Sequence, residues 1–226
     1  MTPPPFSLSR ARFDAVLVDL DGTMVDTLGD FDAVLNAMLA EMALPAVPRA
    51  FIEHTVGKGS EHLIRSTLAQ VGALAERFDE AWERYQRIYL AINGEHARVY
   101  DGVVEALTLW QQAGFQLACL TNKPGAFATG LLERKGLSAF FTLTVGGDAH
   151  PRKKPDPMPL LKTCEALGVT PARTLMVGDS SNDLQAARAA GCAVVLVPYG
   201  YNHGRSVDDL GADGVCARLD QLVPLA

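Results

Sequence analysis

The residues of this chain that are best suited to chemistry lie in four short, separated segments. They are Asp19-Leu20-Asp21-Gly22-Thr23, Leu120-Thr121-Asn122, Lys153-Lys154-Pro155 and Gly178-Asp179-Ser180-Ser181-Asn182-Asp183. Together they supply two acidic pairs, a hydroxyl group and an ammonium group. Magnesium prefers oxygen ligands, and an ammonium group can neutralise phosphoryl oxygens. The segments therefore predict a magnesium-dependent phosphoryl transfer through an aspartate nucleophile.

The first acidic pair has the spacing of a nucleophile and its acid/base partner. Asp19 and Asp21 are two positions apart at a strand end, so their side chains point to the same side. We expect Asp19 to attack phosphorus and form an aspartyl-phosphate. We expect Asp21 to protonate the leaving oxygen and then to deprotonate the hydrolytic water. A lone Asp-x-Asp at a turn is more often structural, but here it follows an apolar run and precedes Gly22 and Thr23.

The second and third segments supply candidate phosphate ligands. The Thr121 hydroxyl, with the backbone amides around Asn122, could hold phosphoryl oxygens. Taken alone, Thr121 is equally compatible with capping the helix that follows. Lys154 lies in a proline-stiffened loop, where a fixed ammonium could neutralise both the nucleophile and the phosphoryl group. A solvated surface lysine is the alternative.

The fourth segment supplies the second acidic pair. Asp179 follows an apolar run and could complete a magnesium site with Asp19. Asp183 lies four residues further on, in the first turn of an expected helix. It could reach the metal through a water molecule, or it could simply face the positive end of the helix dipole.

The elements between these segments predict a sheet that brings them together. Apolar runs end just before Asp19, Thr121 and Asp179, as in strands buried on both faces of a parallel sheet. Ligand sites in such sheets form outside the carboxyl ends of the strands. From Val103 onward, helix and strand alternate with short glycine-containing connections. We therefore expect an α/β fold with a Rossmann-like, doubly wound parallel sheet.

A helical insert interrupts this alternation after the first strand. Apolar residues recur at helical spacing between residues 26 and 97, and no strand pattern occurs there. Thr27 and Asp30 have the spacing of a capping box at the start of the first of these helices. We therefore expect a Rossmann-like catalytic core of residues 1–25 and 98–226, with an all-helical cap domain of residues 26–97.

The composition excludes several classes of function. The net charge is -6 and basic residues do not cluster in long runs, so a nucleic-acid partner is not expected. The sequence contains no stretch of roughly 20 apolar residues of the kind that crosses a membrane. The proline-rich residues 1–10 are expected to form a loose tail. The four cysteines have no metal-binding spacing, so we expect buried thiols and a cytoplasmic protein, monomeric or homodimeric.

The four segments, in this order, resemble the four motifs of the haloacid dehalogenase-like superfamily. The similarity extends over essentially the whole chain from Phe13 onward, and the insert matches the cap of one branch of that superfamily. The resemblance implies that Mg²⁺ is bound by Asp19, by the backbone carbonyl of Asp21 and by Asp179. It also implies that Thr121 and Lys154 bind phosphate. Dehalogenases of the superfamily lack the aspartate found here at position 21, so phosphatase activity is expected instead.

A narrower resemblance points to a substrate. The segment Pro198-Tyr199-Gly200-Tyr201-Asn202 resembles the same region of bacterial phosphoglycolate phosphatases, and Val56-Gly57-Lys58-Gly59-Ser60 lies where capped members place their specificity loop. That family often has Asn where this chain has Lys58. Lys58 and Gly59 are thus expected to contact substrate, and Lys58 could bind a carboxylate or a second phosphate; an exposed loop lysine is the alternative.

The expected substrate is a small phosphorylated metabolite, with 2-phosphoglycolate as the first candidate. A sugar phosphate, an amino-sugar phosphate such as N-acetylmuramate 6-phosphate, and pyrophosphate are the nearest alternatives. A phosphosugar mutase and a non-catalytic binding protein also remain open.

Overall fold

The computed structural model describes residues 6–225, and its centre is a six-stranded parallel sheet with the strand order β6-β5-β2-β7-β8-β9. The strands are β2 (Ala15–Val18), β5 (Gln116–Leu120), β6 (Leu143–Val145), β7 (Thr174–Gly178), β8 (Ala193–Leu196) and β9 (Gly214–Val215). The three strands at the centre are almost wholly buried, because they have layers of side chains on both faces.

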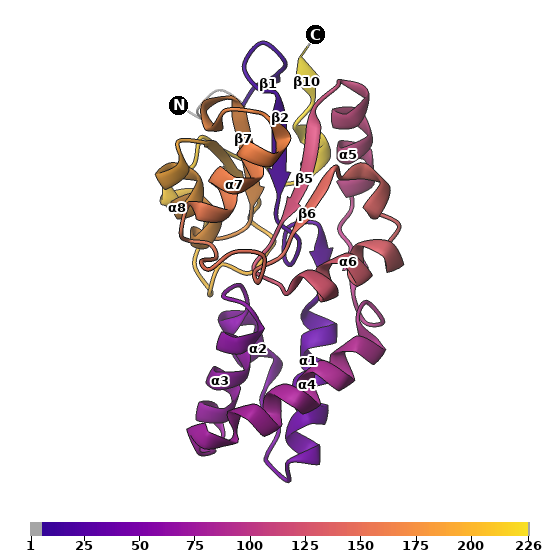
Figure 1. The fold of residues 1–226 in the computed structure, drawn as a ribbon, viewed down its shortest axis with the longest axis vertical. Helices are drawn as coiled ribbons and strands as arrows, with labels where there is room; N and C mark the ends of the chain where they lie inside the picture. The colour runs from indigo at the N-terminus through magenta and orange to yellow at the C-terminus, as the bar shows by residue number, and fades with distance from the viewer. Residues whose placement is uncertain (1–5, 226) are drawn as a thin grey trace.

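Helices cover both faces of this sheet (Figure 1). One face packs against α5 (Val103–Gln112) and α6 (Gly125–Arg134), and the other against α7 (Met158–Leu167) and α8 (Ser181–Ala190). Successive residues of β2 alternate between the two clusters: Val16 packs with the first pair of helices and Leu17 with the second. The predicted doubly wound α/β fold is confirmed.

Four further helices lie beyond the carboxyl end of the sheet, at the bottom of the view in Figure 1. They are α1 (Leu28–Glu41), α2 (Arg49–Thr55), α3 (Ser60–Gln70) and α4 (Phe78–Ile92). The apolar residues of these helices and of the loops between them form a cluster of their own, which only Phe127 and Tyr201 join from the rest of the described chain. We call residues 28–92 the cap and the remainder the core.

Two short strands connect the cap to the core. β3 (Val25–Asp26) pairs antiparallel with β4 (Arg98–Val99), so the chain enters and leaves the cap side by side. The pair adjoins residues 26 and 97, the bounds expected for the cap domain, and that residues 26–97 form a domain stays a prediction. Strands of two residues are too short to produce a readable alternation, which explains why the sequence showed none.

The capping box expected at the start of α1 is wrong. Thr27 is the N-cap of α1 but makes no side-chain capping hydrogen bond. The fully buried carboxylate of Asp30 instead accepts hydrogen bonds from the backbone N–H groups of Gly94 (2.6 Å) and His96 (2.7 Å). It thereby fixes the segment between α4 and β4 to the beginning of α1. The Asp30 carboxylate thus binds the backbone N–H of Gly94, 64 residues away in the sequence, and not an N–H of its own helix.

The expected loose tail is also partly wrong. Leu8–Ser9 form β1, which pairs in parallel with β10 (Pro224–Leu225) at the end of the molecule opposite the cap. The first five residues of that expected tail lie outside the described residues. No helix within residues 6–225 is long and apolar enough to cross a membrane.

Candidate active site

Three strand ends deliver the predicted site residues to one edge of the sheet. β2 lies between β5 and β7, with Val18 opposite both Cys119 and Val177. The chain therefore leaves these three strands at nearly the same level, and Asp19, Thr121 and Asp179 follow within two residues of that level. Each is nearly buried, with 9%, 3% and 3% of its surface exposed. This convergence is the arrangement that the sequence predicted.

The acidic residues form a tight cluster around one ammonium group. Carboxylate oxygens of Asp19, Asp179 and Asp183 lie within 4.8 Å of one another. Lys154 enters the cluster from the loop before α7, and its Nζ lies 3.0 Å from Asp19 Oδ1 and 2.7 Å from Asp183 Oδ1. The same Nζ donates to the carbonyl of Leu120 at 2.7 Å. Three carboxylates thus face one cation, so full ionisation leaves two uncompensated negative charges.

The pKa values report the same excess of negative charge. Burial raises the pKa of Asp19 to about 7, although the neighbouring Lys154 opposes this shift. Burial also raises the pKa of Asp179 well above its usual range, and the charges of Asp183 and Asp19 add to the effect. Burial alone would lower the pKa of Lys154, but the carboxylates of Asp183 and Asp19 raise it overall. Lys154 therefore stays charged, while the carboxylates lack a second cation.

Asp183 caps the start of its own helix and also faces the acidic cluster. Its Oδ2 accepts from the hydroxyl of Ser180 at 2.8 Å and from the Ser180 backbone N–H at 3.2 Å, completing a capping box at the start of α8. Its Oδ1 remains turned toward Lys154 and the acidic cluster. The helix start consequently holds this carboxylate rigidly beside Asp19 and Asp179.

A hard divalent cation fits this cluster. The donors are carboxylate oxygens, and Mg²⁺ binds such sets with a few protein oxygens, substrate phosphate and water. Asp19 Oδ1 is buried and, within residues 6–225, has the Lys154 ion pair but no aligned hydrogen-bond donor. A dication would offset the two excess negative charges. The residues that could hold it are Asp19, Asp179 and Asp183; the Asp21 side chain turns elsewhere.

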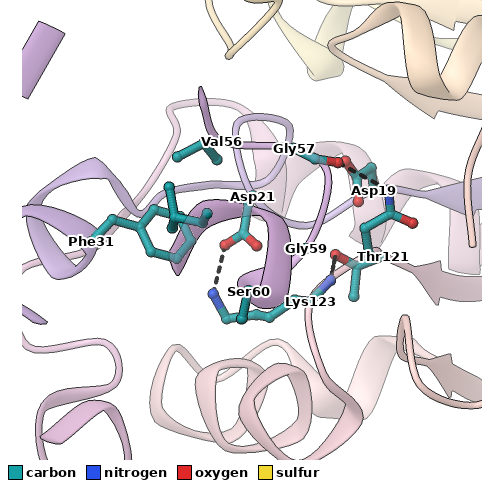
Figure 2. Close-up of a pocket in the computed structure, with 11 residues that line it drawn as sticks. Asp19, Asp21, Phe31, Val56, Gly57, Gly59, Ser60, Thr121 and Lys123 are labelled. Atoms are coloured by element: carbon teal, nitrogen blue, oxygen red, sulfur yellow. Dashed lines mark hydrogen bonds and ion pairs between the residues drawn. The ribbon is translucent and has the colours of Figure 1, made fainter. Parts of the chain in front are cut away.

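A small cavity lies between the cap and this cluster (Figure 2). Asp19, Asp21, Thr121 and Asn122 line it from the core, and Gly59 lines it from the cap. Its volume is about 30 Å³, counted as the space open to the centres of water-sized spheres. That is room for roughly two water molecules. In this closed arrangement the site accommodates only very small groups.

Gly22 shows why the turn after Asp21 requires glycine. Its φ is +82°, and a Cβ at this position would lie 2.1 Å from Asp179 Oδ2. A side chain here would therefore strain the backbone and displace a carboxylate of the cluster.

Contacts across the cavity hold the cap against the core. The carbonyl of Gly57 accepts from the side-chain amides of Asn122 (2.9 Å) and Asn182 (3.3 Å). The Asn122 amide also donates to the Lys154 carbonyl at 2.8 Å. Asn122 thus connects the cap loop to the lysine loop, whereas the sequence suggested only that it binds substrate.

Lys58 lies outside the small cavity. Its side chain is exposed and lines a second, wider cavity of about 740 Å³, which Lys154 also lines. Basic residues dominate the lining of that cavity, which includes Arg65, Lys153 and Arg205. The neighbouring Gly59, in contrast, lines the small cavity as expected.

Sequence reasoning missed two residues at the site. Lys123 follows Asn122 and is 4% exposed, and its Nζ lies 2.9 Å from Asp21 Oδ1. Tyr201 donates its hydroxyl to Asp26 at 2.6 Å, and the same oxygen accepts the backbone N–H of Leu28 at 3.0 Å. Lys123 could have been suspected, because it directly follows two predicted phosphate ligands. Tyr201 belongs to the segment 198–202 that resembles phosphoglycolate phosphatases, but nothing in that segment indicated its contacts with Asp26 and Leu28.

Comparisons with known proteins agree with this geometry. The model of the haloacid dehalogenase-like hydrolase family matches residues 16–197. A phosphoglycolate phosphatase of Thiobacillus denitrificans is 43% identical over 208 residues, which are 91% of this chain and 92% of that protein. A phosphoglycolate phosphatase of Nitrosospira multiformis is 43% identical over 216 residues, which are 93% of this chain and 94% of that protein.

A solved structure gives the same result for the fold. The crystal structure of a predicted phosphoglycolate phosphatase from Haemophilus somnus superposes with a TM-score of 0.88 at 30% identity, covering 93% of this chain and 96% of that one. The family match spans the sheet except for its edge strand β9 and the first residue of β2, it includes all four motif segments, and the relatives align over nearly their whole length. The chain belongs to the haloacid dehalogenase-like hydrolase family.

Proposed function

We propose that this protein is a magnesium-dependent phosphatase that hydrolyses 2-phosphoglycolate to glycolate and phosphate. The observation that carries the proposal is the cluster of Asp19, Asp179 and Asp183 around Lys154, at the mouth of a cavity that also holds Asp21. Relatives that are 43% identical and align over almost their full length bear the name phosphoglycolate phosphatase.

The reaction begins with Asp19 as the nucleophile. One of its oxygens attacks phosphorus to give an aspartyl-phosphate, while Asp21 protonates the departing ester oxygen. Lys154 and Thr121 hold the phosphoryl oxygens and stabilise the charge that develops on them. Asp21 then deprotonates a water molecule, which attacks the aspartyl-phosphate and restores Asp19. Bound Mg²⁺ supplies charge neutralisation between the nucleophile and the phosphoryl group.

The cavity between Asp19 and the cap is too small for any substrate in the arrangement that the structure shows. Its volume is about 30 Å³, less than a phosphate ester occupies. Substrate must enter when the cap moves away, and β3 with β4 is the natural hinge because both connections run through this pair. Residues 26–97 then act as a cap domain that excludes bulk water during the reaction.

Two coarser expectations extend this proposal. The four cysteines are buried and free, which is typical of a reducing compartment, so we propose a cytoplasmic location. We also propose that the protein works as a monomer or homodimer.

The test is phosphate release in the presence of Mg²⁺ from a panel of substrates. The panel contains 2-phosphoglycolate, a hexose phosphate, N-acetylmuramate 6-phosphate, a β-phosphosugar and pyrophosphate. We expect kcat/KM for 2-phosphoglycolate to exceed every other value at least about tenfold, a difference of about 1.4 kcal/mol in transition-state binding. A preference for another substrate would support the phosphatase mechanism but reject 2-phosphoglycolate as the substrate. Release from none, with isomerisation of the β-phosphosugar, would identify a mutase.

A further inference from the structure

Lys123 is a buried ammonium group with unused hydrogen-bonding capacity. It carries three N–H donors, and within residues 6–225 its single hydrogen-bond acceptor is Asp21 Oδ1 at 2.9 Å. The side chain is only 2% exposed, so water cannot readily satisfy the remaining donors. Leaving a buried charged group with unmet donors is costly. The unmet capacity indicates that an anion from outside the chain completes this site.

Aromatic rings of the cap hold Lys123 in place. Its Nζ lies 4.6 Å from the centre of the Phe31 ring and 4.8 Å from that of Tyr89, within range of cation–π attraction. Those rings come from α1 and α4 and stack on each other. Lys123 itself comes from the core, so closure of the cap surrounds this ammonium with apolar faces. The closed cap thus removes competing water from whatever Lys123 binds.

Lys123 is also the one cation among the eleven residues that line the small cavity (Figure 2). The figure shows its Nζ directed at the Asp21 carboxylate beside that cavity. Lys58 cannot fulfil the same role here, because it lines the second, wider cavity. An anionic group that enters the small cavity has Lys123 as its partner.

The contact with Asp21 defines which anionic group fits. In the proposed reaction Asp21 lies beside the leaving oxygen, and Lys123 Nζ lies 2.9 Å from Asp21 Oδ1. In 2-phosphoglycolate a carboxylate is joined through a single CH₂ group to that same leaving oxygen. The substrate carboxylate would therefore reach the donors of Lys123 that Asp21 leaves free.

We propose that Lys123 is the specificity-determining residue of this enzyme and binds a carboxylate attached one carbon from the phosphate ester. The proposal rests on the phosphatase function proposed above. It separates two roles. Asp21 takes part in the hydrolysis of any phosphomonoester, and Lys123 recognises the carboxylate of the substrate.

The experiment compares two substrates that differ only in the carboxylate. 2-Phosphoglycolate and 2-hydroxyethyl phosphate share the ester and the two-carbon skeleton, but the second carries an uncharged CH₂OH group. For Lys123→Gln we expect kcat/KM to fall roughly 10- to 100-fold more for 2-phosphoglycolate than for 2-hydroxyethyl phosphate, as for a lost hydrogen bond to a charged group. Lys123→Arg keeps the cation and should retain a larger part of the preference.

The comparison also separates recognition from mere positioning. If Lys123 only orients Asp21, both substrates lose the same factor and their ratio in kcat/KM stays that of the wild type; this outcome would overturn the proposal. Lys58→Gln is the matched control, and loss of preference in that variant alone would also overturn it. Should Lys123→Gln fail to fold, Lys123→Met decides, because it keeps an apolar side chain of similar length against the Phe31 and Tyr89 rings without the charge; a wild-type preference in that variant would overturn the proposal.

Failure of the proposed function has a different signature. It would appear in the wild-type protein as an absence of preference for 2-phosphoglycolate over 2-hydroxyethyl phosphate. The proposal for Lys123, in contrast, fails where the wild type shows this preference and the variant without a charge at position 123 keeps it.

Discussion

Replacing Asp19 by asparagine should stabilise the metal-free protein while abolishing turnover. Most substitutions of buried residues lower the free energy of unfolding, so an increase caused by this substitution is diagnostic. Asp19 is 9% exposed, and burial raises its pKa to about 7, against about 4 in an unfolded chain. Asn has nearly the same shape but carries no charge, so this variant removes the cost of ionising a buried group.

The direction of the pH dependence follows from the raised pKa. Between about pH 4 and 7 the folded state holds a proton on Asp19 that the unfolded state has released, so stability falls as pH rises through this window. A difference of about three pH units corresponds to roughly 4 kcal/mol at pH 8. The raised pKa already includes the attraction between Asp19 and Lys154, so the expected gain in unfolding free energy at pH 8 is at most about 4 kcal/mol.

The assay is urea-induced unfolding in a chelator at pH 5 and at pH 8. We expect Asp19→Asn to be more stable than the wild type at pH 8 and the difference to shrink at pH 5. Asp209→Asn, at an exposed position, is the matched control and should change neither value by more than about 0.5 kcal/mol. Mg²⁺ should stabilise the wild type more than the variant. An Asp19→Asn variant that is less stable than the wild type at both pH values would refute the reasoning.

Two further substitutions test the structural framework. Gly22→Ala places a Cβ 2.1 Å from Asp179 Oδ2 at a φ of +82°. It should therefore weaken Mg²⁺ binding, measured by calorimetry, and lower the free energy of unfolding by about 1–3 kcal/mol. An unchanged Mg²⁺ affinity would contradict this close approach. Asp30→Ala leaves the backbone N–H groups of Gly94 and His96 without their acceptor, so it should lower the free energy of unfolding in urea by about 2–4 kcal/mol. Thr27→Val should cost little, because the Thr27 hydroxyl has no hydrogen-bond partner among residues 6–225. Equal losses in the last two variants would favour the capping box over the observed contacts.

The sequence is most informative where local pattern and tertiary position coincide. Strands buried on both faces appear as short apolar runs, and these runs alone correctly predict that the residues after Val18 and Val177 lie at one edge of the sheet. Helical periodicity in residues 26–97 similarly predicts α1, α3 and α4. These features depend on a few consecutive residues, and so they can be read from one chain.

The features that were missed depend on distant partners. The spacing of Thr27 and Asp30 suits a capping box, but the Asp30 carboxylate accepts a hydrogen bond from the backbone of Gly94 instead. Lys123 has the sequence context of an ordinary loop lysine, because its burial depends on rings from α1 and α4, many residues earlier. The same holds for Lys58, which lies in the expected specificity loop but lines the wider cavity. The direction of a side chain in a loop is set by packing, and no local pattern encodes it.

The central claim is that catalysis proceeds through a phosphorylated Asp19. The most direct measurement mixes the enzyme with Mg²⁺ and ³²P-labelled 2-phosphoglycolate, quenches with acid within one turnover, and locates the label by peptide mass spectrometry after proteolysis. The account predicts a hydroxylamine-labile phosphoryl group on the peptide that contains Asp19, and none in Asp19→Asn. Turnover in the wild type without any labelled peptide, or label on a different residue, would contradict it.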